Sequence, residues 1–373
     1  MQISVWEAES FFASQDVVII GGGFVGLWSA LTLKQRRPHL KVTLVDRGVV
    51  PTGASGRNAG FACFGSPTEL LHDAEVMGWN ALLTLVHMRF SGLQRIQQHF
   101  SAQQIGYEQS GGYELMPPLA NKKNWTDQIQ DLNTQLQAIT GSPQTFSVVA
   151  NDTFGFGNTS FLIKTALEGG LHSGLLLQQL TQQVQALGVQ IFTGTAVEHM
   201  EQSNRGWTLH TNHHFTLYCS QVLVCTNAFA RELLPELEVA PARGQVLLTA
   251  PIPNLHWQGT FHAEEGYYYF RNLGNRVLLG GARHTAFEAE ATTHMHTTES
   301  LQQRLEDYLT HIILPKQSYT IERRWSGIMG MGPVKGPILQ QVKPQLYCAV
   351  RMSGMGVALA PEVAQQVCTL MGY

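Results

Sequence analysis

The sequence VVIIGGGFVG, at residues 17–26, is the strongest indication of fold class in this chain. Its first four residues are apolar and β-branched, which is typical of a strand covered on both faces in a parallel sheet. After the glycines, the apolar residues from Leu27 to Leu33 recur with helical spacing, and Val42 to Asp46 predict a second strand that ends in an acid. The sequence therefore predicts one β-α-β unit.

The glycines of this stretch follow the pattern G-x-G-x-x-G. Gly21 is expected to make the tight turn, Gly23 to let the backbone approach a pyrophosphate, and Gly26 to let the helix pack on the strand. The helix N-terminus then offers N–H groups to the phosphates, and Asp46, 20 residues after Gly26, can bind a ribose. The alternative is a glycine-rich turn without a ligand. The dinucleotide contacts predicted here are Gly21, Gly23, Phe24, Val25, Gly26, Asp46 and Arg47.

A second loop of small residues, GASGRNAG at residues 53–60, follows the second strand. Small residues allow a backbone to run close to a flat ligand, and polar side chains among them can meet phosphate or ring heteroatoms. A dehydrogenase that binds NAD alone has no need of this loop. The cofactor contacts predicted in it are Ser55, Gly56, Arg57, Asn58, Ala59 and Gly60.

With both loops in place, the first 65 residues resemble the D-amino-acid-oxidase-like (DAO) superfamily of FAD-dependent oxidoreductases. It includes glycine oxidase, sarcosine oxidase and gamma-glutamylputrescine oxidase, and GASGRNAG is most similar to the last. The resemblance implies bound FAD and an α/β fold, in which a Rossmann-like FAD-binding domain is interleaved with an α+β substrate domain built on an antiparallel sheet. The FAD-binding domain is expected at residues 1–78, 170–238 and 322–373, and the substrate domain at 79–169 and 239–321.

Later segments extend the resemblance. A buried strand at residues 222–225 is expected to return to the first sheet, and the family implies that Thr226 and Asn227 lie near the cofactor. The family also implies a backbone contact from Val197, which alone would be a core valine. After a strand at 346–350, the loop Gly354, Met355, Gly356 and Val357 opens a helix whose N-terminus can stabilise negative charge on the reduced flavin. Helices are also predicted at 79–100, 121–139 and 175–187, and strands at 105–115, 242–251, 267–270 and 276–280.

Substrate-binding residues are less clearly marked. The family implies that Tyr267 contacts a substrate carboxylate, although a tyrosine there is by itself more simply a packed core residue. The family's W-x-G-x-R-P motif has Met329 in place of its arginine, which puts a simple amino-acid substrate in doubt. The closing motif G-H-S-G-x-G has Arg351 and Met352 in place of its first two residues. Arg351 has either taken over anion recognition or pairs with a surface acid.

Other candidates for the substrate side follow from position alone. Two further arginines are the next to consider as anion anchors: Arg271 within the predicted hairpin at 267–280, and Arg283 just after it. His172, just before the helix at 175–187, is the histidine to consider for catalysis.

The composition favours a small-molecule substrate. Lys and Arg number 24 against 27 Asp and Glu, and a net charge of -3 gives no basic field for nucleic acid. No apolar window reaches the length of a membrane span. The five cysteines form no C-x-x-C pair or zinc-ligand cluster, which favours a reducing, cytoplasmic location and no metal. None lies in residues 325–337, where sarcosine oxidases carry their covalent flavin link, so FAD is expected to be non-covalent.

These features predict an FAD-dependent oxidoreductase that oxidises an amine or an N-substituted amino acid by hydride transfer to flavin N5. The electron acceptor, oxygen or a quinone, stays open. Two alternatives remain: a 2-hydroxy-acid or polyol dehydrogenase of the same superfamily, and a flavin-binding protein with degraded catalysis, which the missing motif arginine suggests. An NAD-only dehydrogenase would leave the second loop unexplained.

Overall fold

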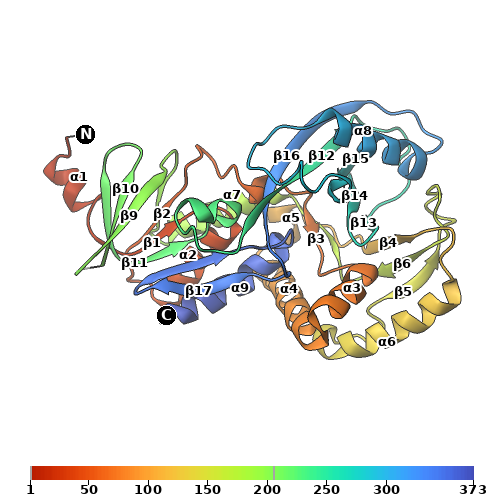
Figure 1. Cartoon of the computed structure of the whole chain (residues 1–373), viewed down its shortest axis with the longest axis horizontal. Coiled ribbons are helices and arrows are strands. Elements are labelled where there is room, and N and C mark those ends of the chain that lie inside the picture. The colour runs from red at the N-terminus through yellow and green to blue at the C-terminus, as the bar shows by residue number, and fades with distance from the viewer. Residues whose placement is uncertain (1, 205) are drawn as a thin grey trace. The chain divides into compact units, whose positions relative to one another are not determined.

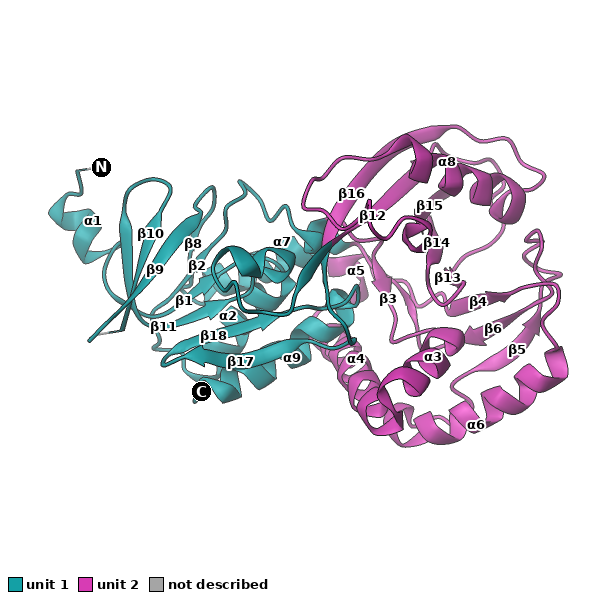
Figure 2. Cartoon of the chain, viewed as in Figure 1, with its two compact units in different colours: residues 1–56, 173–241, 329–373 teal, residues 57–172, 242–328 magenta. Residues whose placement is uncertain are grey.

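The computed structural model describes residues 2–204 and 206–373, which fall into two compact units (Figures 1 and 2). Unit 1 comprises residues 1–56, 173–241 and 329–373, and unit 2 comprises residues 57–172 and 242–328. The chain passes repeatedly from one unit to the other, so neither unit is a continuous piece of sequence.

Unit 1 is built on a sheet in the order β17-β18-β11-β1-β2-β8 (Figure 1). β1 (Gln15–Ile20) lies between β2 (Val42–Val45) and β11 (Thr216–Val224) and runs parallel to both. β8 (Gln190–Phe192) and β18 (Leu346–Val350) continue the parallel sheet, and β17 (Ile338–Lys343) forms an antiparallel edge. β9 (Val197–Ser203) and β10 (Gly206–Thr211) extend β11 as antiparallel strands.

The apolar run of β1 forms the centre of this unit. Val17, Val18 and Ile19 are fully buried, as a strand in the middle of a parallel sheet requires. Helix α2 (Phe24–Arg36) packs against α7 (Ser173–Ala186) and α9 (Gly356–Leu370). The remaining helical segments are α1 (Val5–Glu9), η1 (Ala54–Gly56) and η2 (Asn227–Glu232). The predicted β-α-β unit is confirmed, and α2 begins at Phe24, inside the glycine pattern.

Unit 2 is built on a second sheet, in the order β16-β12-β15-β14-β13-β4-β6-β5. A hairpin at its centre joins β14 (Tyr268–Leu273) to β15 (Arg276–Gly281), and the antiparallel strands β12 (Ala240–Thr249) and β13 (Thr260–Ala263) flank it. The outer strands are β4 (Gly112–Met116), β5 (Ser147–Ala150), β6 (Phe161–Thr165) and β16 (Ile321–Met331). β3 (Phe61–Ala62) and β7 (Gly169–Gly170) pair with each other.

The two faces of this second sheet bury different side chains. Phe270 and Leu279 lie in a core completed by α8 (Glu299–Tyr308) and the π-helix η4 (Leu309–Ile313). Leu278 and Tyr269 belong to a separate apolar cluster. Because successive residues of a strand point to opposite faces, Tyr269 points away from the core that holds Phe270.

The remaining helices of unit 2 are α3 (Pro67–Met77), α4 (Trp79–His99), α5 (Ala102–Ile105), α6 (Lys122–Thr140) and the short η3 (Arg283–Thr285). The expectation of strands over residues 105–115 is wrong in its first half, because α5 ends at Ile105 and β4 begins at Gly112. Ser101 caps α5 by accepting from the amide of Gln104, and Gly106 ends it in the left-handed conformation. These are ordinary helix boundary signals that the short apolar pattern did not reveal.

The predicted α/β fold class is confirmed by one largely parallel and one largely antiparallel sheet. Throughout residues 2–204 and 206–373, no helix has the length and apolar character needed to cross a bilayer. The domain bounds and the cytoplasmic location stay predictions.

Candidate functional site

The glycines of the first loop stand where a side chain would collide with backbone. At Gly26 a Cβ atom would overlap the carbonyl oxygen of Gly21, so α2 can approach β1 this closely only through glycine. Gly21 has a φ of +111°, and a Cβ atom there would lie 2.7 Å from the carbonyl oxygen of Cys225, just after β11. These contacts agree with the structural roles of the first and third glycines in a dinucleotide-binding turn.

The start of α2 is open to an anion. Its N-cap residue, Gly23, has no side chain to bond the first-turn amides, and no acidic residue lies in that turn. The amide of Phe24 donates to Oγ of Ser55 at 2.9 Å, and a Cβ atom on Gly23 would lie 2.9 Å from the same oxygen. Ser55 thus engages one first-turn amide, and because the N-cap residue adds no capping side chain, the other first-turn N–H groups and the partial positive charge of the helix N-terminus remain for a phosphate. The surroundings of Gly23 therefore suit a pyrophosphate.

Asp46, at the end of β2, holds the glycine loop. Its Oδ2 accepts a hydrogen bond from the amide of Gly22 and its Oδ1 accepts one from the amide of Gly48, each at 2.8 Å. Partial burial raises the pKa of Asp46, and these hydrogen bonds oppose the rise. Each carboxylate oxygen keeps a lone pair that a ribose hydroxyl can use. The neighbouring Arg47 is exposed and lies 3.2 Å from Glu232.

Buried hydroxyl groups without a protein partner lie in the loop after β11 and in the loop before α9. Oγ1 of Thr226, after β11, and Oγ of Ser353, before α9, make no hydrogen bond with the described residues. A buried polar atom without a partner is costly, so such atoms point to a ligand or to water. Thr226 lies beside the glycine loop, because a Cβ atom on Gly21 would be 3.3 Å from its amide nitrogen. The residues present therefore fit a bound dinucleotide.

Asn227 joins the end of β11 to the closing loop. Its Oδ1 accepts hydrogen bonds from the amides of Arg351 and Met352, at 3.0 and 3.2 Å. Helix α9 begins at Gly356, and the residue before it, Met355, supplies no capping side chain. The predicted contacts from Gly354 to Val357 thus lie at a second helix start in unit 1 whose N-cap residue adds no capping side chain.

The second predicted loop, residues 53–60, passes from unit 1 to unit 2 after Gly56. In unit 2, the carbonyl oxygen of Arg57 accepts from the indole of Trp325 at 2.9 Å. Oδ1 of Asn58 accepts from the amide of Gly60 at 2.8 Å, which closes a tight turn. These bonds fix the course of the loop, and its contact with a cofactor stays a prediction.

Two predicted contacts lie in apolar clusters. Val197 is the first residue of β9, pairs with Thr211 and packs at the edge of the core of unit 1. Ala59 packs with Leu278 on the Tyr269 face of the sheet of unit 2. Their roles toward a cofactor also stay predictions.

The three residues predicted for catalysis are divided between the units, with Arg351 in unit 1 and both Tyr267 and His172 in unit 2. Arg351 is buried, and its Nε and Nη1 donate to the carbonyl oxygens of Gly336 and Glu238, at 3.0 and 3.2 Å. Its guanidinium is therefore held by backbone carbonyl groups rather than by a carboxylate. Tyr267 directly precedes β14, and His172 is exposed. The catalytic roles of all three stay predictions.

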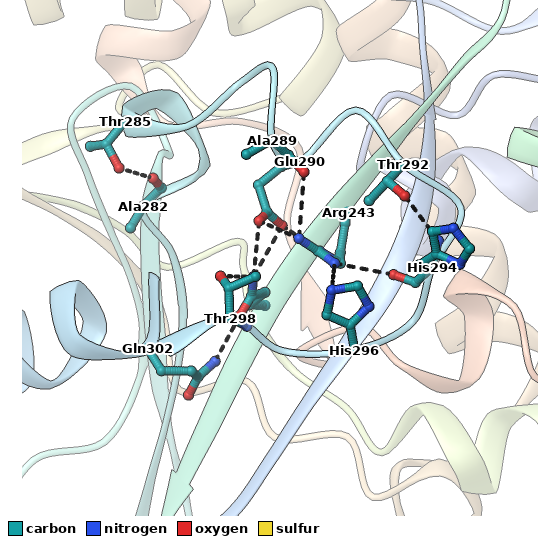
Figure 3. A network of polar contacts seen from close by, with 11 residues as sticks. Arg243, Ala282, Thr285, Ala289, Glu290, Thr292, His294, His296, Thr298 and Gln302 are labelled. Atoms are coloured by element: carbon teal, nitrogen blue, oxygen red, sulfur yellow. Dashed lines mark hydrogen bonds and ion pairs between the residues drawn. The ribbon is translucent and has the colours of Figure 1, made fainter. Parts of the chain in front are cut away.

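Arg243 on β12 lies in a buried polar network (Figure 3). Its Nε and Nη2 donate to the carboxylate of Glu290, each at 2.7 Å, and Nη1 lies 3.0 Å from Nε2 of His296. Gln245 also donates to both oxygens of Glu290, at 3.0 and 3.1 Å. Glu290 is therefore fully engaged. No sequence pattern marks this network, because Glu290 is 47 residues away from Arg243 in a stretch without a motif.

Arg271 and Arg283, the other arginine candidates, differ in their surroundings. Arg271 is buried, and its Nη1 donates to the carbonyl oxygens of Gly60 and Leu171, at 2.6 and 3.0 Å. Arg283 is half-buried, and its guanidinium makes no hydrogen bond or ion pair with the residues that the structure describes. It lies over the ring of Phe287, 4.7 Å from the centroid. Arg271 thus has a structural task, whereas Arg283 interacts with the ring of Phe287 and, electrostatically, with Tyr267, Tyr269 and Glu290.

Unit 2 also buries titratable groups that no motif marks. Burial raises the pKa of Glu114 to about 7 and that of Glu168 to about 8, although both accept hydrogen bonds from backbone amides. Burial lowers the pKa of His262 to about 4, and neither of its ring nitrogens has a partner among the described residues. The sequence alone does not indicate that these glutamates and this histidine are buried, because their burial depends on the packing of segments that are distant in the chain.

Comparison with known proteins agrees with the geometry of unit 1. A family model for FAD-dependent oxidoreductases, the DAO family, matches residues 16–370. A probable oxidoreductase, OrdL of Rhizobium meliloti (strain 1021), is 24% identical over 361 residues, which cover 92% of this chain and 80% of that protein.

Two solved structures share the fold. Glycine oxidase from Geobacillus kaustophilus matches with a TM-score of 0.73 at 19% identity, over 96% of this chain and 95% of that chain. L-alpha-glycerophosphate oxidase from Mycoplasma pneumoniae, with FAD bound, matches with a TM-score of 0.75 at 18% identity, over 97% and 95%. Likeness at this identity shows the fold, whereas the match of the family model over most of the sequence shows the family. The chain therefore belongs to the DAO family of FAD-dependent oxidoreductases.

Proposed function

We propose that unit 1 binds FAD non-covalently and that the enzyme oxidises an amine or an N-substituted amino acid. The observation that carries this proposal is the start of α2, where the N-cap residue Gly23 adds no capping side chain. This helix start lies beside a glycine loop with no room for side chains and beside the unpartnered hydroxyl of Thr226. The likeness to glycine oxidase supports the choice of an amine substrate.

The chemistry follows from the cofactor class. When bound, FAD supplies flavin N5 as the acceptor for a hydride. The substrate C–H bond breaks with its electron pair leaving as that hydride, the nitrogen lone pair forms a C=N bond, and the nitrogen loses a proton to solvent. Water then hydrolyses the imine to a carbonyl compound and an amine. The protein has to bind and orient a neutral amine, which requires positioning rather than an acid-base triad.

In this proposal, different residues of unit 1 bind different parts of FAD. In this proposal the first-turn amides of α2 hold the pyrophosphate, Asp46 binds the ribose, and the start of α9 at Gly356 stabilises negative charge on the flavin. The other proposed contacts are Arg47, Ser55, Gly56, Arg57, Asn58, Ala59, Gly60, Val197, Thr226 and Asn227. On the substrate side, Tyr267 and His172 are the proposed groups. The carbonyl acceptors of Arg351 favour a different arginine as anion anchor.

Non-covalent binding is supported by the state of the thiols. Burial raises the pKa of every cysteine, namely Cys63, Cys219, Cys225, Cys348 and Cys368. A buried thiol that stays protonated is a poor nucleophile and does not readily form a bond to a flavin.

A second candidate function is the oxidation of a 2-hydroxy acid or a polyol. The observation in its favour is Met329, which stands where the family's carboxylate-binding arginine is expected. Its sulfur lies 3.7 Å from the position of a Cβ atom on Gly354, so it borders the closing loop. The likeness to L-alpha-glycerophosphate oxidase also supports this candidate.

An anaerobic reduction screen separates these candidates. The purified, yellow holoprotein is mixed without oxygen with primary amines, N-methyl amino acids, 2-hydroxy acids and polyols, and loss of the oxidised flavin absorbance is recorded. Reduction by an amine or N-methyl amino acid supports the main proposal, and reduction by hydroxy compounds alone supports the second. If nothing bleaches the flavin, the chain binds flavin without these activities. Admitting oxygen or a quinone to the reduced protein then identifies the electron acceptor.

A further inference from the structure

Residues 286–298 connect η3 to α8 in unit 2, and the structure describes all of them; we call this segment the strap. None of its apolar side chains is buried, and Phe287 is 46% exposed. The one buried side chain of the strap is that of Glu290, which is 1% exposed. Because the strap adds no apolar side chain to the core, polar contacts have to hold it on the sheet.

The strap is organised around the guanidinium of Arg243, on β12 (Figure 3). Nε and Nη2 of this arginine donate to the two carboxylate oxygens of Glu290, each at 2.7 Å, which is a strong bidentate arrangement. Its Nη1 and Nη2 also donate to the carbonyl oxygens of His294 and Ala289, at 3.4 and 3.5 Å. Nε2 of His296, 3.0 Å from Nη1, must accept, because a guanidinium only donates. One arginine therefore binds four residues of the strap.

The end of the strap is bound by Gln245, two residues further along β12. Its Nε2 donates to Oγ1 of Thr298 at 2.9 Å, and its Oε1 accepts from the amide of Thr298 at 3.0 Å. Nε2 of Gln302, on α8, donates to the same Oε1 at 3.2 Å. The strap thus joins α8 at a fixed point, and its middle depends on the contacts of Arg243.

Phe287, near the start of the strap, packs on two side chains beside the β14–β15 hairpin. Its ring lies edge-on to the ring of Tyr267, with 5.9 Å between the centroids. The guanidinium of Arg283 lies 4.7 Å from the centroid of the same phenylalanine ring. The amide of Glu290 donates to the carbonyl oxygen of Ala286 at 3.0 Å, so one turn of chain joins Phe287 to the buried carboxylate. The position of Phe287 therefore depends on how Glu290 is held.

We propose that the strap is a cover that opens locally, with the Arg243–Glu290 ion pair as its latch. In the closed form, Phe287 shields Tyr267 and Arg283. A segment without buried apolar side chains opens at a lower cost in free energy than the sheet on which it lies. Removing one partner of the pair while the strap stays closed would leave a buried charge uncompensated, whereas opening returns both charges to water. The pair therefore favours one closed position and still permits opening.

Arg243 is a positioning residue in this proposal, because it acts on Tyr267 only through the strap. Tyr267 is a substrate-side group in the proposed function, so opening of the strap would control access to that side. This consequence rests on the proposed function. The latch can be tested without substrate and without reduction of the flavin, so its failure is distinguishable from failure of that function.

Hydrogen exchange, read by mass spectrometry on the purified holoprotein, measures opening of the strap. The variants Arg243→Met and Glu290→Gln weaken the latch. The matched control is Glu322→Gln, which breaks the ion pair of Glu322 with Arg276, at 3.4 Å between β15 and β16 of the same unit. We expect the amides of the strap to exchange roughly tenfold faster or more in Arg243→Met. Glu290→Gln, which keeps an oxygen for the guanidinium, should show a smaller rise. The amides of β14 and β15 should keep their exchange rates in both variants, and the control should match the unchanged protein throughout.

Shielding by the strap is measured by the rate at which phenylglyoxal, a reagent for arginine, modifies Arg283. Phe287→Ala removes the shielding ring and keeps the latch, so Arg283 should react roughly threefold faster or more while exchange in the strap stays unchanged. Arg243→Met should also raise the reaction rate of Arg283, because the strap opens more often. Arg323, whose side chain is 73% exposed, is the internal control in each sample and should react at one rate in all variants.

Unchanged exchange of the strap in Arg243→Met would overturn the latch. Exchange that rises equally in the strap and in β14 and β15 would overturn it as well, because the strap would then open only with the rest of unit 2. Unchanged modification of Arg283 in Phe287→Ala would show that the strap does not shield it. If Arg243→Met does not fold, Glu290→Gln decides alone, and unchanged exchange of the strap in that variant contradicts the proposal.

Discussion

The carboxylate of Asp46 accepts a hydrogen bond from the amide of Gly22 at 2.8 Å. This bond joins the end of the second strand to the middle of the glycine loop, and the other carboxylate oxygen accepts from Gly48. One side chain therefore fixes the loop and the turn after β2 together. The sequence pattern predicts a ribose contact for Asp46, but it does not indicate this structural role.

Replacing Asp46 by alanine should weaken FAD binding. Both backbone amides lose their acceptor, and a ribose hydroxyl loses a charged one, which is typically worth about 1.5 to 3 kcal/mol. We expect the dissociation constant of FAD to rise by roughly tenfold or more, as measured by fluorescence titration of the apoprotein. Asp16→Ala, at the start of the same β-α-β unit, serves as the control. An unchanged FAD affinity in Asp46→Ala would contradict the assignment.

Bulky replacements in the glycine loop should abolish FAD binding. In Gly23→Val the branched side chain would collide with Oγ of Ser55 and occupy the space predicted for the pyrophosphate. Gly53→Ala is a matched control, because a Cβ atom there would have no neighbour within 4 Å. The flavin absorbance of the purified variants is the measurement. Retention of FAD by Gly23→Val would remove the cofactor site from this loop.

FAD should leave the protein on acid denaturation. The five thiols are buried, and burial raises their pKa, so no reactive thiolate is offered to the flavin ring. Precipitation with trichloroacetic acid should put all of the flavin in the supernatant, where its absorbance is compared with that of the holoprotein. Yellow colour that stays with the pellet would show a covalent bond instead.

Local sequence patterns predict those parts of the fold in which residues contact partners that are near them in the sequence. The apolar run of β1, the glycines before α2 and the acid after β2 are all readable within 30 residues. The contact of Gly21 with Cys225 requires a strand that returns after a long insertion. Likewise, Oδ1 of Asn227 binds the amide of Arg351, 124 residues later. Such long-range partners have no local signal, so the task of each residue becomes visible only in the folded chain.

Burial of Glu168 should make the protein less stable as the pH rises. Its pKa in the folded protein, about 8, exceeds the ordinary value of 4.5, so the folded state holds the proton more tightly than the unfolded state. The stability that the tighter binding of this proton contributes is fully present below pH 4.5, and it is lost as the pH rises through 8. We expect the free energy of unfolding to fall over this interval in denaturant titrations.

The variant Glu168→Gln isolates that effect. The amide is neutral at every pH and keeps an oxygen for the amide of Phe64, which donates to Glu168 at 2.8 Å. The fall in stability between pH 4.5 and 8 should therefore become smaller in Glu168→Gln. Glu198→Gln, on the exposed side of β9, should leave the pH profile unchanged. Identical pH profiles for Glu168→Gln and the unchanged protein would show that Glu168 does not bind its proton in this way.

Arg351→Met tests whether this arginine supports the fold or binds the substrate. Its guanidinium donates to the carbonyl oxygens of Gly336 and Glu238, so its removal leaves two backbone acceptors without that partner. Loss of a buried hydrogen bond of this kind costs about 1 to 3 kcal/mol. We therefore expect a lower free energy of unfolding, normal FAD content and unchanged kinetics of flavin reduction by substrate. The backbone at Arg351 has a φ of +66°, so Arg351→Lys, which keeps the charge in the same conformation, separates strain from the loss of the guanidinium. If Arg351→Met instead keeps the free energy of unfolding of the unchanged protein, and a tenfold or more higher concentration of an acidic substrate is needed to reduce its flavin, Arg351 binds the substrate anion rather than supporting the fold.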